Sequence, residues 1–357
     1  MIDPTRTVIT GQSANQAARA DRADLYRRMD VQHLAPLWEV IANLIPAEPL
    51  SPCEPAFWQY RALRPFILES GDLITAQEAI RRVLVLENPG LRGQSRVTQS
   101  LYAGLQLIMP GETAPMHRHS QAALRFVVEG RGAFTAVNGE RVAIQPGDFI
   151  ITPSWTWHDH GNPGEEPVVW LDGLDVPLVQ ALAAQFHEIP PPGGATGPGA
   201  RRPPAASYGN NLAPLDAQPP FGPTSPVFCY PYDRSRESLE AMARGCEPDA
   251  SHGWKMKYLN PLTGGHAMPT MGAFLQKLPK GFKSLACRST DGAVYSVAEG
   301  RGRVKLGDAW QAFEARDHFV LPSWTSAAFE AEDDCVLFSF SDRAAQESLG
   351  LWRERRG

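Results

Sequence analysis

Three histidines stand at spacings that could hold a metal ion. One residue separates His117 from His119, and His158 follows further along the chain. Side chains of a β-strand alternate between its two faces, so histidines at i and i+2 point the same way. If a neighbouring strand brings in the third imidazole, the three ligands leave coordination positions of a first-row metal open. Open positions are what an oxygen-activating or Lewis-acid metal requires.

The residues around these histidines decide between a metal site and an incidental pair. An isolated His-x-His on a strand is often a surface pair or a satisfied core pair. Here the histidines fall in two segments framed by Gly or Asn, residues 111–130 and 147–162, and Pro153 and Trp155 precede His158. This combination favours the metal site.

Part of the amino-acid sequence occurs twice in the chain. Glu-Gly-Arg-Gly at 129–132 returns at 299–302, a shift of 170, and Pro-Ser-Trp-Thr at 153–156 returns at 322–325, a shift of 169. The repeat indicates an internal duplication of a β-barrel unit. The second copy has Cys287, Ser289 and Ala327 where the first has the three histidines. We therefore expect the second barrel to bind no metal and to serve as structure.

Other polar residues are expected to face the same site. Arg125 lies on an apolar strand, so it is a candidate clamp for a carboxylate, with a structural ion pair as the alternative. His160 shares the face of His158 and could hydrogen-bond a substrate oxygen or relay a proton; the alternative is a solvent-facing rim position. Tyr102 and Gln106 share a face of one further strand.

Arg81 and Arg82 begin a predicted strand and Asp172 ends one, so site roles, caps and surface pairs all stay open for them. The remaining histidines lack ligand spacing, and we expect them to be surface or incidental residues: His33, His187, His252, His266 and His318.

The elements that must position these residues indicate a mainly β fold. Short β-rich segments begin at Arg82 and return from Gly272, separated by a Pro/Gly-rich stretch over 188–226. We expect two jelly-roll-like β-barrels with N-terminal and connecting helical segments. The predicted domains are an N-terminal helical or irregular extension (1–80), a metal-binding barrel (81–178), a linker and helical connection (179–270), a metal-free barrel (271–342) and a C-terminal helix (343–357).

Composition excludes several classes of function. The 357 residues carry a mild formal charge of −5 with no basic block, which argues against a nucleic-acid partner. No apolar run approaches the ~20 residues of a membrane span. The N-terminus lacks the apolar core of a secretory signal, and the five cysteines form no Cys-x-x-Cys pair. We therefore expect a cytoplasmic protein with reduced thiols.

The two histidine segments resemble the two motifs of the cupin superfamily, whose small barrels hold a metal. A carboxylate usually stands there at the position of Ala123, and a glycine at that of Trp155. Three neutral histidines without the carboxylate leave Fe(II) with two formal positive charges. That charge favours a substrate that chelates as an anion, such as an aromatic acid with an adjacent hydroxyl; zinc hydratases with three histidines remain an alternative.

The chain more specifically resembles the gentisate 1,2-dioxygenase family. The resemblance lies in RRVLVLENPGL, SLYAGLQ, HRHSQAALRFVVEG, GDFIITPSWTWHDHGNPG, WLDGLD, YDRSRE, GAFLQKLPKGF and LFSFSDR, and it extends from about residue 30 to the end. It implies a homotetramer of bicupin chains with Fe(II) on His117, His119 and His158. It also implies that gentisate and O2 react there to give maleylpyruvate, in a pocket lined by Arg81, Tyr102, Gln106, Arg125, His160 and Asp172.

Other activities remain open on sequence alone. The family includes salicylate and 1-hydroxy-2-naphthoate dioxygenases, and the same fold serves non-oxidative metal-binding cupins and zinc or manganese lyases and isomerases. Gentisate ranks first because it is the commoner substrate of such sequences and because Tyr102, not tryptophan, follows Leu101.

Overall fold

A computed structural model describes residues 19–191, 208, 214–215 and 222–357. The chain forms two compact units, Met1–Leu50 and Ser51–Gly357. In the first unit residues 19–31 are helical and α2 spans Leu37–Leu44. Most of the Pro/Gly-rich stretch predicted as a linker lies outside the described residues. Of the helices that are described, none is long and apolar enough to cross a membrane.

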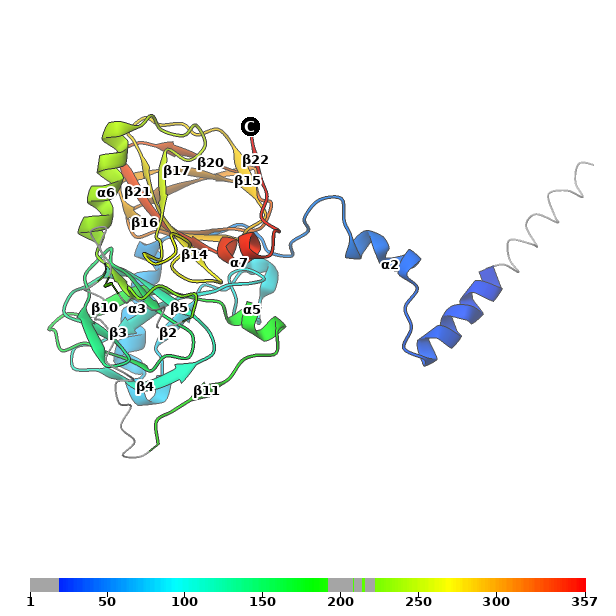
Figure 1. The fold of residues 1–357 in the computed structure, drawn as a ribbon, viewed down its shortest axis with the longest axis horizontal. Helices are drawn as coiled ribbons and strands as arrows, with labels where there is room; N and C mark the ends of the chain where they lie inside the picture. The colour runs from blue at the N-terminus through cyan, green and yellow to red at the C-terminus, as the bar shows by residue number, and fades with distance from the viewer. Residues whose placement is uncertain (1–18, 192–207, 209–213, 216–221) are drawn as a thin grey trace, which may run out of the picture. The chain divides into compact units, whose positions relative to one another are not determined.

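The second unit is mainly β and contains two jelly-roll-like barrels, which confirms the predicted fold class. In Figure 1 the first barrel (cyan to green) lies below the second (yellow to red), and α6 runs along one side of the pair. The helices are α3 (Tyr60–Leu73), α4 (Ala76–Ala79), the 3-10 helix η1 (Pro89–Leu91), α5 (Val176–Ala181), α6 (Tyr232–Gly245) and α7 (Arg343–Ser348).

The first barrel consists of two antiparallel sheets, with strand orders β12-β8-β5-β10-β3-β2 and β11-β4-β9-β6-β7. Its strands are β2 (Val83–Val85), β3 (Tyr102–Ile108), β4 (Thr113–His119), β5 (Ala123–Glu129), β6 (Phe134–Val137), β7 (Glu140–Ala143), β8 (Phe149–Thr152), β9 (His158–Gly161), β10 (Val168–Leu174), β11 (His187–Glu188) and β12 (Cys229–Tyr230).

The second barrel repeats this plan, with strand orders β1-β19-β16-β21-β14-β13 and β18-β17-β20-β15-β22. Its strands are β1 (Ala56–Trp58), β13 (Trp254–Lys257), β14 (Gly272–Leu278), β15 (Cys287–Ser289), β16 (Ala293–Glu299), β17 (Arg301–Leu306), β18 (Ala309–Glu314), β19 (His318–Leu321), β20 (Ala327–Ala331), β21 (Cys335–Ser341) and β22 (Glu354–Arg356).

The duplication is wider than the sequence indicated, because each repeat begins with a strand and a helix that precede its barrel. These leading strands are exchanged between the barrels. β1 precedes the first barrel but pairs with β19 of the second, and β12 precedes the second barrel but pairs with β8 of the first. The leading strand of each repeat therefore completes the larger sheet of the other barrel.

A tyrosine at the start of each leading helix joins the two barrels. The hydroxyl of Tyr60 donates to Glu129 at 2.9 Å, and its backbone N–H donates to Asp317 of the second barrel at 2.8 Å. The second repeat makes the matching bonds from Tyr232 to Glu299 and Asp148.

The larger sheets of the two barrels pack against each other through aromatic rings. Phe126 of β5 stacks on Phe338 of β21 with ring centroids 4.2 Å apart, and Phe149 of β8 lies 5.5 Å from the same ring. All three side chains are almost fully buried. Strands such as β5 and β10 are therefore covered on both faces, which is why they read as nearly continuous apolar runs.

The C-terminal segment differs from the predicted helix over 343–357. Helix α7 ends at Ser348, and Gly350 adopts a φ of 71°, the left-handed conformation that commonly stops a helix. The chain then forms β22, whose Glu354 pairs with Ser289 and whose Arg356 pairs with Cys287 of β15.

The expectation that His318 is a surface or incidental residue is wrong. Its side chain is fully buried in the second barrel, at the position that Phe149 occupies in the first repeat. Neither of its ring nitrogens has a hydrogen-bond partner among the described residues. Burial lowers the pKa of His318 to about 3.

This burial predicts a pH dependence of stability. Between about pH 3 and 6.5 the unfolded chain binds a proton at His318 that the folded chain does not, so this residue lowers stability as the pH falls through that window. We expect His318→Phe, which copies the first repeat, to flatten the decrease in unfolding free energy by up to ~1.4 kcal/mol per pH unit. Urea unfolding at pH 7, 6 and 5 measures this slope, and an unchanged slope would contradict the assignment.

Candidate functional site

The repeated Pro-Ser-Trp-Thr forms the same tight turn in both barrels. Trp155 has a φ of 61° and Trp324 a φ of 63°, a left-handed conformation that is costly for any residue but glycine. The backbone N–H of Trp155 donates to the carbonyl of His119 at 2.8 Å, and Trp324 makes the matching bond to Ser289 at 2.7 Å. In the first barrel this bond ties the turn before β9 to the end of β4.

The structure brings the three predicted ligands together inside the first barrel. His117 on β4 pairs directly with His158 on β9, and their ring centroids lie 4.1 Å apart. The ring of His119 lies 4.8 Å from that of His158, and one nitrogen of each imidazole lies within 4.8 Å of the others. In the second barrel Cys287 pairs with Ala327 in the same register, which confirms the alignment of the two repeats.

Backbone carbonyls fix the orientation of all three imidazoles. A carbonyl can only accept, so the Nδ1 of His119 and of His158 must carry the proton, and their Nε2 keeps its lone pair. At His117 the Arg81 guanidinium, which can only donate, also lies 2.6 Å from Nδ1 and 3.0 Å from Nε2. The Nε2 of His158 is buried without a hydrogen-bond partner among the described residues, an arrangement that a metal ion would satisfy. The carbonyls lie 3.1, 2.8 and 2.8 Å from His117, His119 and His158, on Pro115, Gln121 and Thr156 respectively.

Burial keeps these imidazoles neutral. It lowers the pKa of His117 to about 3, with help from the Arg81 guanidinium, and the pKa of His119 to about 4. The pKa of His158 also lies well below its usual value, again mainly through burial. Neutral imidazoles are the form that binds a metal, so the donor set fits a first-row metal ion at neutral pH.

Arg125 on β5 faces this group from the opposite sheet and is buried. Its Nη1 donates to the Thr152 hydroxyl at 2.7 Å. Its Nε lies 3.4 Å from Asp172 on β10, an ion pair that falls short of hydrogen-bond geometry. The structural ion pair that was the alternative for Arg125 is therefore present, but it leaves the guanidinium unsaturated.

The pocket holds more positive than negative charge. Arg81 places its Nη2 3.0 Å from the Nε2 of His117, and burial together with Arg125 lowers its pKa to about 10, so it stays charged. Burial raises the pKa of Asp172 to about 6 against the effect of Arg125, which leaves it mostly ionised at pH 7. Two arginines thus face one carboxylate, and an anionic ligand would balance them.

His160 lies on β9 beyond His158 and is fully buried, so the alternative of a solvent-facing rim position is wrong. Its Nδ1 lies 3.1 Å from the Thr135 hydroxyl, and its Nε2 has no hydrogen-bond partner among the described residues. Gln106 is buried on β3, and Tyr102 is half-buried at the start of the same strand. Burial and the charge of Asp172 raise the pKa of the Tyr102 hydroxyl, so it stays protonated.

The sequence prediction missed two residues that shape this pocket. Trp170 lies on the same face of β10 as Asp172, and its indole N–H donates to that carboxylate at 3.0 Å. Thr152 ends β8 and binds Arg125. The two-residue alternation that singled out His117 and His119 would also have identified Trp170, two positions before Asp172. Arg82, in contrast, is structural: it forms a two-pronged ion pair with Glu112.

We predict that His119→Ala abolishes metal binding at this site and leaves the fold intact. The removed nitrogen is one of three ligands, whereas the Trp155 bond uses the backbone carbonyl of residue 119 and survives the change. Ser289→Ala is the matched control, because Ser289 holds the same position in the second barrel. Iron content after anaerobic reconstitution with Fe(II), alongside circular dichroism, tests this, and normal iron loading of His119→Ala would contradict it.

Known proteins resemble the chain over part and over all of its length. The model of the cupin domain matches residues 104–175, which include the three histidines and strands of both sheets around them. A gentisate 1,2-dioxygenase of Aquipseudomonas alcaligenes is 51% identical over 348 residues, which cover 95% of this chain and 98% of that protein. A 1-hydroxy-2-naphthoate 1,2-dioxygenase of a Nocardioides species is 34% identical over 96% of this chain and 89% of that protein.

A solved structure agrees with the fold of the whole chain. The salicylate 1,2-dioxygenase of Pseudaminobacter salicylatoxidans matches with a TM-score of 0.86 and 32% identity, over 94% of this chain and 97% of that one. The same enzyme has been solved as an adduct with gentisate, with a TM-score of 0.86 and 33% identity over 94% of each chain.

Proposed function

We propose that this chain, which belongs to the gentisate 1,2-dioxygenase family, opens the aromatic ring of gentisate with dioxygen. The carbon–carbon bond between the carboxyl-bearing and the hydroxyl-bearing carbons breaks, and both oxygen atoms enter the product, maleylpyruvate. The observation that carries the proposal is the excess of buried positive charge beside three neutral imidazoles. Such a pocket requires an anion, and gentisate brings a carboxylate.

We propose Fe(II) as the metal, held by Nε2 of His117, His119 and His158. The metal supplies the redox chemistry by which dioxygen can react with a closed-shell ring. Three neutral ligands keep both formal charges of the ion, since Ala123 stands where other cupins have a carboxylate. The chain therefore leaves that charge to be balanced by the substrate.

The arginines would hold the substrate carboxylate. Arg125 offers its unsaturated Nε, and Arg81 offers a guanidinium that lies against His117. Asp172 and Thr152 fix the Arg125 side chain, so Asp172 acts as a positioning residue. Gln106 and Tyr102 on β3 would contact the ring and its hydroxyl groups from the side.

His160 would act on a proton of the substrate. Its neutral imidazole is buried with a free Nε2, and burial together with the positive charge of Arg125 holds its pKa well below the usual value. It can accept a hydrogen bond from a phenol and receive its proton as the ring becomes electron-rich. The second barrel has Phe329 at this position, which supports a role outside the scaffold.

The family resemblance further supports a homotetramer in the cytoplasm. Light scattering on the purified protein would test the assembly, and a monomer at micromolar concentration would contradict it.

An oxygen-uptake assay tests metal, reaction and substrate together. Protein reconstituted with Fe(II) should consume oxygen in equimolar amount with gentisate and form an ultraviolet-absorbing ring-opened acid, and metal-free protein should not. Salicylate and 1-hydroxy-2-naphthoate are the comparison substrates. Turnover of either one without turnover of gentisate would move the chain to that branch of the family, and uptake without iron would contradict the proposal.

Arg125→Met tests the carboxylate clamp. Loss of a charge-assisted hydrogen bond of about 1.5–3 kcal/mol should raise KM for gentisate roughly 10- to 100-fold. Arg125→Lys keeps the charge without the planar guanidinium, so its KM for gentisate should lie between those of the wild type and Arg125→Met. Arg131→Met, which removes an exposed arginine of the same barrel, is the control. Circular dichroism and iron content show whether each variant is intact, and an unchanged KM for intact Arg125→Met would refute the clamp.

A further inference from the structure

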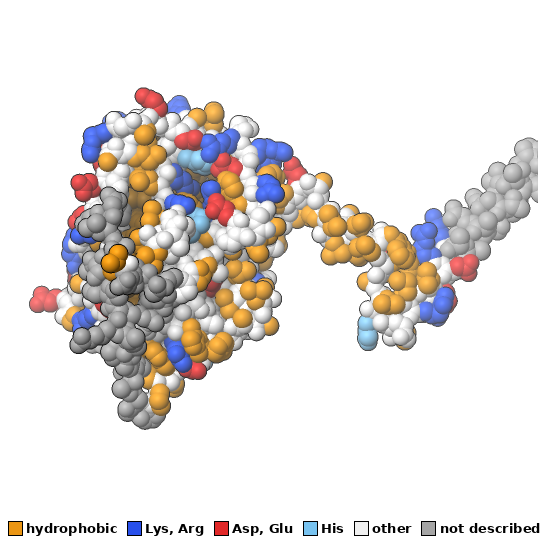
Figure 2. Space-filling model, in the orientation of Figure 1, with side chains coloured by type: hydrophobic (Ala, Val, Ile, Leu, Met, Phe, Trp, Pro, Cys, Tyr) orange, Lys and Arg blue, Asp and Glu red, His pale blue; other side chains and the backbone are white. Residues whose placement is uncertain are grey.

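The second barrel has a cavity of about 330 Å³ where the first barrel has its site. Figure 2 shows basic, acidic and histidine side chains gathered over this barrel, in the upper part of the view. Residues at positions equivalent to the first site line the cavity, but their chemistry differs. They are Cys287, Ser289 and Ala327 in place of the three histidines, Tyr295 in place of Arg125, and Ser339 in place of Asp172.

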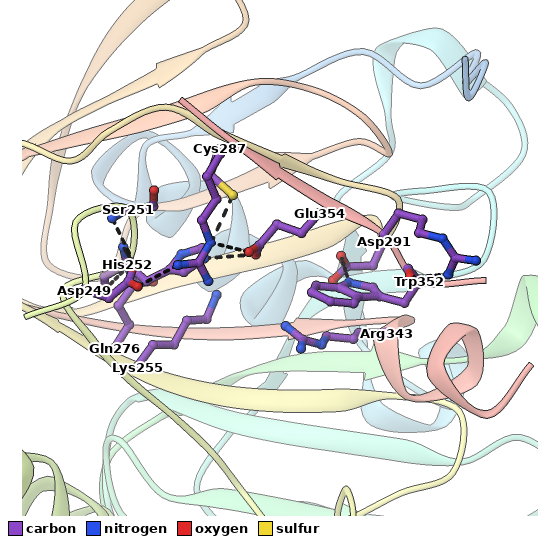
Figure 3. A network of polar contacts seen from close by, with 12 residues as sticks. Asp249, Ser251, His252, Lys255, Gln276, Cys287, Asp291, Arg343, Trp352 and Glu354 are labelled. Carbon is purple, nitrogen blue, oxygen red and sulfur yellow. Dashed lines mark hydrogen bonds and ion pairs between the residues drawn. The ribbon is translucent and has the colours of Figure 1, made fainter. Parts of the chain in front are cut away.

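Three potential metal donors meet on one wall of this cavity. The Nε2 of His252 lies 3.0 Å from a carboxylate oxygen of Glu354 and 3.9 Å from the Sγ of Cys287. All three donor atoms lie within 4.8 Å of one another. Figure 3 shows the three side chains converging from separate segments of the barrel. Cys287 holds the position of His117, whereas the other two donors lie outside the repeated motifs.

The backbone holds each donor in place. Asp249 accepts the N–H groups of Ser251 and His252 at 2.9 and 3.0 Å, which closes the turn that carries the histidine. Gln276 of β14 donates to the carbonyl of His252 at 2.8 Å. Pairing of β22 with β15 fixes Glu354 beside the strand of Cys287. The donors are thus already positioned by the fold.

We propose that the second barrel binds a divalent metal ion of the Zn²⁺ class through His252, Cys287 and Glu354. Sulfur, imidazole nitrogen and carboxylate oxygen are the donors that Zn²⁺ takes in proteins, and three protein ligands leave one position open toward the cavity. Soft sulfur distinguishes this site from the first barrel, whose ligands are all imidazoles. The site goes beyond the proposed ring-opening reaction and does not depend on it.

The local charges accommodate a dication. Arg356 is neutralised by Glu354 and Asp249, at 2.5 and 2.6 Å, and Lys255 adds one further positive charge nearby. A thiolate at Cys287 would add a third negative charge beside Glu354 and Asp249. Burial and Glu354 keep the thiol protonated without a metal, so binding releases its proton to water.

The proposed site differs from the expectation that the second barrel binds no metal. That expectation rested on the loss of the three histidine equivalents, whereas two of the three proposed donors, His252 and Glu354, come from elsewhere in the chain. His252 precedes β13, and Glu354 begins β22, where the first repeat has His187 at the matching place of β11. A bound ion would therefore fasten the C-terminal strand to the barrel.

Titration with Co²⁺ tests the site, because only a thiolate ligand gives Co²⁺ a sulfur-to-metal charge-transfer band in the near ultraviolet. The full-length protein with Fe(II) already bound in the first barrel should develop this band with one equivalent of Co²⁺, and His119→Ala, which lacks a ligand of the first barrel, should develop it unchanged. Cys287→Ser should lose it, whereas Cys246→Ser, at an exposed cysteine, should keep it. Absence of the band in the wild type, or its survival in Cys287→Ser, would overturn the proposal.

A second measurement tests the proposal if Cys287→Ser fails to fold. Zn²⁺ should raise the unfolding temperature of the wild type, and Glu354→Gln should reduce that shift while weakening Co²⁺ binding at least ~10-fold. An equal Zn²⁺ shift in the wild type and in Glu354→Gln would place the ion elsewhere.

Discussion

Burial inside the first barrel constrains the ionisable groups that face its centre. Burial keeps His117, His119 and His158 neutral, and the carbonyls that accept the Nδ1–H groups of His119 and His158 leave their Nε2 atoms directed away from the backbone. The same burial raises the free energy of an unbalanced charge. The positive charges of Arg81 and Arg125 exceed the single negative charge of Asp172, so an anionic ligand would stabilise the pocket. Metal affinity and substrate charge thus follow from one constraint, the low polarity of the barrel.

The barrel keeps that interior closed only with help from its duplicate. β12 extends the larger sheet of the first barrel, and β1 does the same for the second. Side-chain bonds also cross the boundary in matching pairs: Ser100 donates to Asp342, and Thr270 donates to Asp175, both at 2.6 Å. Loss of the histidines from the second copy leaves these contacts untouched, whereas loss of its scaffold would open the first barrel.

The sequence predicted what is encoded locally and in the repeat. The spacing of His117 and His119 and the two copies of Pro-Ser-Trp-Thr indicated the histidine cluster with His158 and the alignment of the two barrels. Resemblance, not spacing, supplied the roles of Arg81 and Asp172. The length of the last helix was mispredicted, because the left-handed Gly350 and the pairing of β22 decide it.

Long-range placement was beyond the sequence. The shift of 169 residues between the repeats aligns His318 with Phe149, but the burial of His318 itself arises from packing between elements far apart in the chain. His252 and Glu354 are separated by about a hundred residues and meet only because β22 folds back along β15. Donors that converge through tertiary structure leave no spacing signal, so the sequence carries no indication that His252 and Glu354 lie beside Cys287.

The differences between the repeats follow the same physical logic as the site itself. Tyr295 replaces Arg125 and Ser339 replaces Asp172, so the two halves of a buried ion pair changed together. Either one alone would be an uncompensated buried charge, which typically costs 3–5 kcal/mol. Gln276 of the second barrel stands at the position equivalent to Gln106 of the first. A neutral amide carries no such penalty, and the Gln276 amide donates a hydrogen bond to the backbone carbonyl of His252. The charged pair is therefore confined to the first barrel, as expected if it serves the reaction proposed there and not the fold that both copies share.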